Sequence, residues 1–339
     1  MRTVAIVLVI LVHATLFPYS VDGLMTSGAQ FDWWTTNIYG ALANMGVPLF
    51  VMLSGVLLLN PSKADEPLGV FFKKRVARIG LPLVFWTIAY FAWGYYMHGY
   101  PATADSVIQG LLGGSYYHLW FLYLLVGLYL ATPVLRIIVK YLDRVKFKFL
   151  LVVWAVGTVA VPFIDEWGIF SYNPVMFVFV DWAGYFLLGI FLLKSQIQRK
   201  LLYLCFALGL AWTVLADAFL PAITGGKFMG FFHEPLNLSL VIASAALFLL
   251  LASVPKIKME SHSNLSRLLH WISKNTLAIY LLHIMVLETF VNGYLGFSLN
   301  MQTFSPILEI PVLTLATFAV TALIVYPLSK IPYLNRLIG

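Results

Sequence analysis

The sequence predicts an all-α membrane protein that crosses the bilayer about ten times, with both termini in the cytoplasm. Of the 339 residues, 61% are hydrophobic and only 10% are charged, and the mean hydropathy is +0.89. A soluble domain carries about 25% charged residues, so this composition indicates a polytopic membrane protein. The spacing of the apolar runs and the placement of the cations support the same conclusion.

Ten apolar runs are each close to the length of about 20 residues that a helix needs to cross the hydrocarbon core. The connections between them are too short for a soluble domain, and the sequence shows no internal repeat. We therefore expect one membrane domain over residues 1–339. The ten expected spans cover residues 4–22, 38–59, 76–97, 118–138, 148–165, 173–193, 201–220, 235–254, 273–292 and 307–328.

The cations lie almost entirely on one side of these spans. With the N-terminus in the cytoplasm, twenty of the twenty-one Lys and Arg residues fall on the cytoplasmic side, and only Lys227 falls outside. This bias satisfies the positive-inside rule and predicts that both termini are cytoplasmic. Arg2 before an apolar run is also compatible with a secretory signal peptide. No small-residue cleavage site follows it, so we interpret the first run as a membrane helix.

The first run carries two polar groups on one face. Arg2 and His13 are eleven residues apart, about three helical turns, so they lie roughly 16 Å apart along the helix axis. A histidine at mid-bilayer depth is costly in lipid and should face a protein interior or a wet cavity. A structural histidine bonded to a neighbouring helix is the alternative, but the arginine on the same face favours a functional role.

Arg75 and Arg78 precede the third span and share a helical face because they are three residues apart. Arginine forks bind phosphate oxygens bidentately, so these residues predict an anion site, which Arg2 can join from the same membrane edge. Simple anchoring by the positive-inside rule is the alternative interpretation.

Two later spans carry further candidates. His118 and Trp120 open the fourth span, where an aromatic residue is also an ordinary interface anchor. Tyr280 and His283 share a face of the ninth span, and Glu288 lies nearer its outer end. Ionisable groups inside a span are functional candidates, and we expect these residues to position a substrate or stabilise an oxyanion.

Several other functions are excluded or disfavoured. The formal charge of +7 does not indicate a nucleic-acid partner, because the cations lie between apolar spans and no nucleic-acid-binding motif accompanies them. The single cysteine, Cys205, cannot form a disulfide framework. The seven histidines show no metal-binding spacing, so we expect no metal site. The partner that composition itself predicts is the lipid bilayer.

Five motifs, in this order and spacing, resemble those of the acyltransferase-3 family of integral membrane acyltransferases, and the resemblance runs essentially end to end. They are Arg2-x10-His13, the Gly-x-Pro-Leu-Phe-x-x-x-Ser-Gly run at residues 46–55, Arg75-x-x-Arg78, His118-Leu119-Trp120-Phe121, and Ile279-Tyr280-Leu281-Leu282-His283. The short chain, the Tyr-His-Leu-Trp-Phe stretch at residues 117–121 and the ending Asn335-Arg336-Leu337-Ile338 are most similar to the surface-polysaccharide O-acetyltransferases.

The resemblance implies a protein of the bacterial plasma (inner) membrane that takes an acyl group, by default acetyl, from cytoplasmic acyl-CoA. It implies transfer to a hydroxyl of a cell-surface glycan or its lipid-linked saccharide precursor, with acyl-CoA as a co-substrate and no permanently bound cofactor. The implied catalytic residue is His13, and the implied acyl-CoA-binding residues are Arg2, Arg75 and Arg78. Two departures concern the first helix. The family's acidic residue three positions before the arginine would fall before Met1, which suggests a start further upstream, and the usual following glycine is Thr3.

The chemistry of His13 and the function itself each leave alternatives open. A neutral imidazole can act as a general base on the attacking hydroxyl or as a nucleophile that forms an acyl-imidazole. The main rival function is a proton-coupled secondary transporter that exports a small metabolite or lipid-linked sugar. A second rival is a flippase or scaffold of an envelope-synthesis complex, in which the polar residues are structural.

Overall fold

The computed structural model of the chain describes residues 1–15, 30–63, 65–101, 103–168, 178–254, 264–299 and 305–339. All regular structure within these residues is helical, as the composition predicts. The helices are α1 (Arg2–Ala14), α3 (Gln30–Ala43), α4 (Gly46–Leu58), α5 (Leu68–Arg75), α6 (Leu81–His98), α7 (Ala104–Gly113), α8 (Trp120–Tyr141), α9 (Arg144–Glu166), α10 (Val178–Leu193), α11 (Arg199–Thr224), α12 (Leu238–Ala252), α13 (Asn264–Lys274), α14 (Thr276–Val291), α15 (Pro306–Leu328) and α16 (Leu334–Ile338). Short helical turns η1 (Pro61–Lys63), η2 (Val76–Gly80), η3 (Tyr117–Leu119) and η5 (Phe231–His233) join some of them.

The described helices make the chain a multi-pass membrane protein. Seven helical segments are long and apolar enough to cross a membrane, and α13 with α14, bent by 80°, forms an eighth if the pair is one span. The first and sixth expected spans contain the shorter apolar helices Arg2–Ala14 and Asp181–Leu193. Residues 16–22 and 173–177 of those expected spans lie outside the described residues. The count of ten spans therefore stays a prediction.

The structure corrects the position of His13 along the first helix. The sequence predicts a helix that continues to residue 22 with His13 near its middle, but α1 ends at Ala14. Thr15 leaves the helical conformation, with φ −86° and ψ 69°, and its hydroxyl bonds back to the Val12 carbonyl. His13 consequently lies in the last turn of α1, at the negative end of the helix dipole.

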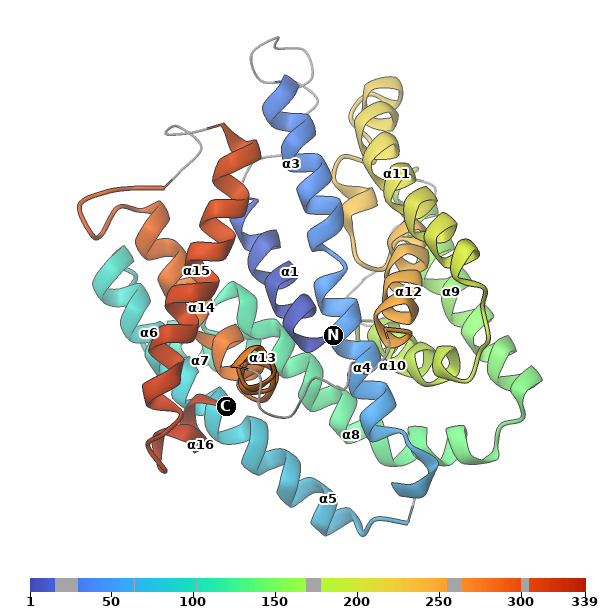
Figure 1. Ribbon diagram of the computed structural model, residues 1–339, viewed down its shortest axis with the longest axis horizontal. Coiled ribbons are helices and arrows are strands. Elements are labelled where there is room, and N and C mark those ends of the chain that lie inside the picture. Colours follow the sequence, from blue (N-terminus) through green and yellow to red (C-terminus); the bar gives the residue numbers. More distant parts are fainter. Residues whose placement is uncertain (16–29, 64, 102, 169–177, 255–263, 300–304) are drawn as a thin grey trace.

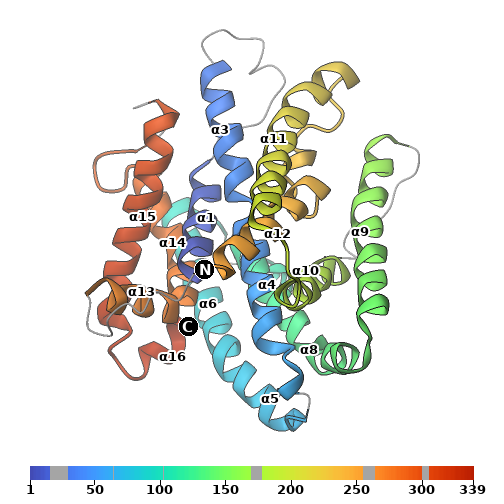
Figure 2. The ribbon, with the colours of Figure 1, turned by 45° about the vertical axis from the view of Figure 1, so that its right-hand side comes forward.

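Helix α1 lies in the middle of the molecule, packed against α3 and α4 on one side and α14 and α15 on the other (Figures 1 and 2). Its residues Ile6 and Ile10 are fully buried. Gly46 allows α4 to approach α1 closely, because a Cβ built there would lie 2.9 Å from the backbone nitrogen of Val9. The enclosure of α1 keeps the polar groups of its face away from lipid.

Helices α4 and α10 pack with their backbones in contact. A Cβ built on Gly55 would lie 1.8 Å from the carbonyl oxygen of Phe186, and one on Gly189 would lie 2.2 Å from that of Met52. Small residues at such crossings allow close van der Waals packing between helices in lipid, where no hydrophobic force drives their association. The glycine that ends the 46–55 motif is therefore a packing residue.

An ion-paired cluster attaches the loop between α4 and α5 to helix α8. Arg136 of α8 is 3% exposed, donates to the Leu58 carbonyl at 2.7 Å and contacts the Glu66 carboxylate at 3.1 Å. Lys74 also binds Glu66, at 2.8 Å. The hydrogen bond from Lys74 is the main reason that the pKa of Glu66 falls below its ordinary value, and Arg136 lowers it further.

The backbone contact at Gly55 predicts that alanine destabilises the protein there but not at Gly69. Gly55→Ala should destabilise the protein by about 1–3 kcal/mol, because the new methyl group must push α10 away from α4. The measurement is the melting temperature in detergent. Gly69→Ala is the matched control: a Cβ on Gly69 of α5 meets nothing within 4 Å, so that variant should melt at or above the wild-type temperature. Equal melting of the two variants would contradict the close packing.

The Glu66 cluster predicts a pH-dependent contribution to stability. Because the folded-state pKa of Glu66 is depressed, the ion pairs stabilise the protein above the ordinary value of 4.5 and lose that effect as the pH falls through the lower folded-state pKa. The melting temperature of Glu66→Gln should therefore lie below that of the wild type at pH 7 and converge with it in acid. A difference that stays constant with pH would exclude this electrostatic origin.

Candidate functional site

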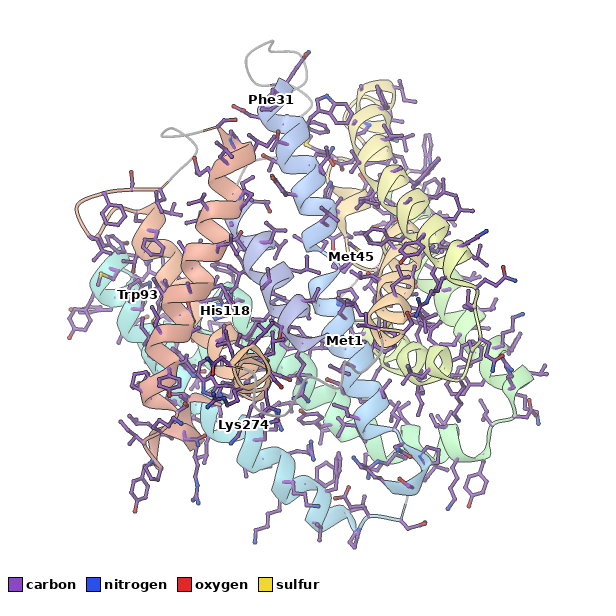
Figure 3. The ribbon with its side chains drawn as sticks, in the orientation of Figure 1. Met1, Phe31, Met45, Trp93, His118 and Lys274 are labelled. Atoms are coloured by element: carbon purple, nitrogen blue, oxygen red, sulfur yellow. The ribbon has the colours of Figure 1, made fainter. Side chains whose placement is uncertain are left out.

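Three histidines from three distant segments form one cluster, here called the histidine cluster. The ring of His13, in the last turn of α1, has its centroid 5.2 Å from that of His283 in α14. His283 lies 5.6 Å from His118 of η3. His118 and His283 are 1% and 0% exposed, whereas His13 is partly exposed. His118 lies inside the molecule (Figure 3). The cluster unites the histidines that the sequence singles out.

Hydrogen bonds to backbone carbonyls determine where the Tyr280 hydroxyl donates and which ring nitrogen of His283 carries the hydrogen. The Tyr280 hydroxyl donates to the carbonyl of His118, and Nδ1 of His283 bonds to the carbonyl of Tyr280. A carbonyl can only accept, so Nδ1 of His283 carries the hydrogen and Nε2 of the neutral ring is an acceptor. Nε2 is buried and has no hydrogen-bond partner within the described residues. His283 is therefore suited to accept an N–H from His13, and less suited to donate to an oxyanion.

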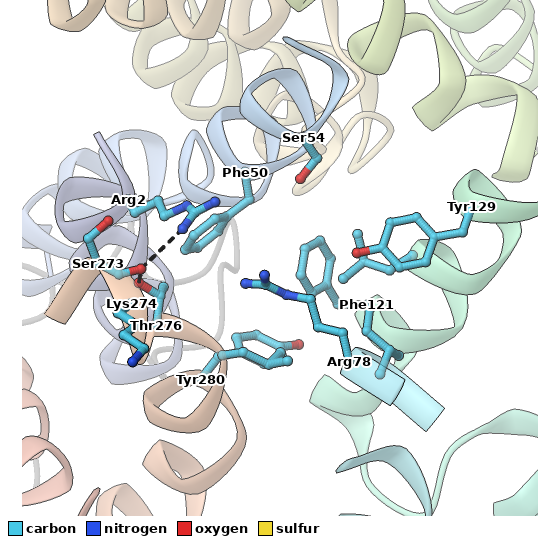
Figure 4. A pocket seen from close by; sticks show the side chains of 13 residues that line it. Arg2, Phe50, Ser54, Arg78, Phe121, Tyr129, Ser273, Lys274, Thr276 and Tyr280 are labelled. Carbon is cyan, nitrogen blue, oxygen red and sulfur yellow. Dashed lines mark hydrogen bonds between the residues drawn. The ribbon is translucent and has the colours of Figure 1, made fainter. Parts of the chain in front are cut away.

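A basic pocket borders Tyr280 (Figure 4). The cavity volume is about 90 Å³, and the pocket is open on one side. None of the described residues that line it is acidic, and its lining consists of basic, aromatic, hydroxyl-bearing and aliphatic residues: Arg2, Arg78 and Lys274; Phe50, Phe121, Tyr129 and Tyr280; Ser54, Ser273 and Thr276; Ile79, Leu125 and Leu277. Tyr280 thus forms one wall of the pocket, and its ring centroid is 5.6 Å from that of His283.

Two irregular features bring the cations to this pocket. Arg78 lies in the π-helical turn η2, and its guanidinium points into the pocket (Figure 4). Extra turns of this kind are often found at functional sites. The 80° bend between α13 and α14 places the end of α13 in the lining, where Arg2 donates to the Ser273 carbonyl at 3.3 Å. Unpaired carbonyls at a helix end attract such a cation.

Arg75 supports the pocket from behind. Its guanidinium carbon lies 5.6 Å from the ring centroid of Tyr129, which lines the pocket, and 5.4 Å from that of Phe71. The three predicted arginines therefore converge on one region, with Arg2 and Arg78 in the lining and Arg75 in the layer behind. Like charges held together without a carboxylate between them favour binding of an anion, and a phosphate is the anion that arginine pairs recognise best.

Two of the predicted acceptor-positioning residues, Trp120 and Glu288, lie away from the histidine cluster. Trp120 is 38% exposed, and its ring contacts Phe121 and Trp182. Glu288 accepts three hydrogen-bonding contacts, from Trp93 Nε1 at 2.7 Å, His98 Nε2 at 3.1 Å and the Tyr116 hydroxyl at 2.5 Å. These bonds tie α14 to α6 and to the segment before α8, one layer away from the histidines.

The sequence reasoning missed the tyrosines beside the cluster. Tyr116 stacks on Tyr90 at 4.7 Å, and Tyr90 meets the edge of His118 at 4.7 Å. Tyr117 contacts His13 directly, with 5.4 Å between the ring centroids. The signal in the sequence is the Tyr-Tyr-His run at residues 116–118, a pattern that is also typical of an interface anchor. Among the described residues, no group of three His, Cys, Asp or Glu side chains is arranged to hold a metal ion.

The fold and the site define an integral membrane protein with an anion pocket adjoining a set of buried imidazoles. A protein-family model described as an acyltransferase domain matches residues 1–326. The chain therefore belongs to the acyltransferase-3 family and is a membrane acyltransferase, as its motifs predict. Comparisons with curated proteins and with solved structures found no match.

The basic pocket predicts binding of a ligand with several phosphates. Arg78→Ala should weaken binding of coenzyme A roughly 10- to 100-fold, because a hydrogen bond to a charged group contributes about 1.5–3 kcal/mol. Arg78→Lys should restore only part of the affinity, since an ammonium cannot form the bidentate contact. Isothermal titration of the detergent-purified protein with coenzyme A measures this. The exposed Arg336 provides a charge-matched control, Arg336→Ala, which should bind like the wild type.

Proposed function

We propose that the protein is an O-acyltransferase that moves an acyl group, by default acetyl, from cytoplasmic acyl-CoA to a hydroxyl of a cell-surface glycan or its lipid-linked precursor. The observation that carries this proposal is that the basic pocket and the histidine cluster share Tyr280 as their common wall. The basic pocket suits a donor that carries phosphates, and the histidine cluster holds groups that can move a proton.

The basic pocket and the histidine cluster match the two ends of an acyl-CoA molecule, its phosphates and its acyl thioester. Its phosphates are multiply charged and cannot enter hydrocarbon, so they are assigned to the pocket of Arg2 and Arg78, with Arg75 behind it. The pantetheine arm is neutral and flexible, and it extends past Tyr280 toward the cluster. Arg2 and His13, at opposite ends of α1, lie roughly 16 Å apart, and the arm bridges that depth.

His13 has two routes to the ester. As a general base it takes the proton of the acceptor hydroxyl while the hydroxyl oxygen bonds to the acyl carbon. The tetrahedral intermediate then breaks its C–S bond, and the proton passes to the CoA thiolate. As a nucleophile His13 forms an acyl-imidazole with release of CoA, and the hydroxyl then displaces the imidazole. Both routes end in the acylated acceptor and free CoA.

The position of His13 at the end of α1 is compatible with the general-base route and with the nucleophilic route, because it stabilises the charge that both create. Both place a positive charge on the ring, and the negative end of a helix dipole stabilises such a charge. His283 is assigned a positioning role, because its Nε2 is an acceptor beside the His13 ring. Tyr280 is not assigned as an oxyanion donor, since its hydroxyl is engaged by the His118 carbonyl. His118 remains the candidate for the oxyanion donor, because its ring nitrogens have no side-chain partner within the described residues.

The acceptor and the cellular setting are proposed from the family resemblance. The motifs of the chain are most similar to those of the surface-polysaccharide O-acetyltransferases, and the positive-inside bias supports a plasma-membrane protein with cytoplasmic termini. The transporter interpretation is not retained, because membership of the acyltransferase family accounts for the intramembrane histidines that motivated it.

The decisive experiment measures transfer of label from radiolabelled acetyl-CoA into envelope glycan by membranes that contain the protein. His13→Ala should reduce transfer roughly 100- to 10,000-fold, the usual contribution of a positioned base, with unchanged melting in detergent. His270→Ala, an exposed histidine of α13, is the matched control and should transfer normally. Normal incorporation by His13→Ala would remove that residue from the chemistry. Absence of transfer by the wild type across several acyl-CoAs would contradict the proposed function.

A further inference from the structure

The exposed ring of Tyr117 lies directly beside the proposed catalytic histidine. Tyr117 is 54% exposed, and its ring meets that of His13 at a centroid distance of 5.4 Å. The other histidines of the cluster, His118 and His283, are 1% and 0% exposed. A molecule that reaches His13 past the exposed ring of Tyr117 therefore need not pass through the buried interior.

The Tyr117 ring is supported by a fixed neighbour. Tyr116 lies 5.2 Å from Tyr117, stacks on Tyr90 and donates to the Glu288 carboxylate at 2.5 Å. Glu288 in turn is held by Trp93 and His98. A tyrosine that merely anchors a helix at the membrane interface needs no such support and no contact with a functional histidine. The arrangement gives a pre-organised aromatic surface beside His13.

This surface and the basic pocket meet the histidine cluster through different residues, Tyr117 and Tyr280. The basic pocket borders the histidines through Tyr280, which is 4% exposed and on the His283 side. Tyr117 meets His13 from η3, the turn just before α8, which is the predicted outer end of that span. The two substrates can therefore approach His13 from different directions, as a transfer between them requires.

We propose that Tyr117 is the acceptor platform, on which a pyranose ring stacks so that one of its hydroxyls meets His13. The C–H face of a pyranose is apolar and packs on an aromatic ring, while its equatorial hydroxyls point outward to polar neighbours. The proposal rests on the proposed function for the identity of the ligand, and it adds the residue that binds the acceptor. Tyr117 is a substrate-binding residue and takes no proton.

The test separates sugar binding from catalysis. Saturation-transfer NMR with the protein in lipid nanodiscs measures binding of methyl β-D-glucopyranoside and methyl β-D-galactopyranoside. Tyr117→Ala should weaken binding of at least one of them roughly tenfold, whereas Tyr117→Phe should retain it because the ring remains. Tyr96→Ala is the control, since Tyr96 is 79% exposed and makes its ring contact with Tyr95, away from the site. Coenzyme A binding and the melting temperature should not change in any of these variants.

Each outcome decides the proposal. Selective loss in Tyr117→Ala supports it, and in the transfer assay the same variant should raise KM for the acceptor with little change in KM for acetyl-CoA. Equal sugar binding by wild type and Tyr117→Ala overturns it, as does the absence of binding of both pyranosides to the wild type. Tyr117-dependent sugar binding without any acyl transfer would instead count against the proposed function and leave the platform standing.

Discussion

The cost of placing polar groups in hydrocarbon governs the arrangement of this protein. Imidazoles within apolar spans are tolerated only where protein surrounds them, and α1, which carries His13, is packed between α3, α4, α14 and α15. The same cost explains why the cations gather at one pocket and why the hydroxyl of Tyr280 and Nδ1 of His283 are both engaged by backbone carbonyls. Burial of these groups thus brings catalytic candidates together from segments that are distant in sequence.

Much of the fold and part of the site could be predicted from sequence. The apolar runs locate the helices, and the structure brings Arg2 beside Arg78 and His13 beside His283. The end of α1 at Ala14 could not be read from periodicity, because an apolar run continues past it and the change occurs in the backbone of Thr15. The 80° bend at Asn275 falls at the start of the expected span 273–292, and α13, the amphipathic helix before it, lies almost entirely outside that span.

The contacts that complete the site depend on tertiary structure. Glu288 and its partners Trp93, His98 and Tyr116 come from three parts of the chain, and no local spacing connects them. Tyr117 was overlooked because an aromatic residue at a helix end is ordinary in membrane proteins. Its contact with His13 distinguishes it from the other exposed tyrosines, and that contact is visible only in three dimensions.

The backbone contact between α4 and α10 restricts how the molecule can move. At Gly55 and Gly189 the two backbones touch with no glycine side chain between them, so we expect α4 and α10 to move together. Helix α1 is held against α4 at Gly46. We expect any movement around α1 to occur on the opposite flank, where α14 and α13 meet it. The bend at Asn275 belongs to that flank, whereas His13 belongs to α1 and stays with α4 and α10.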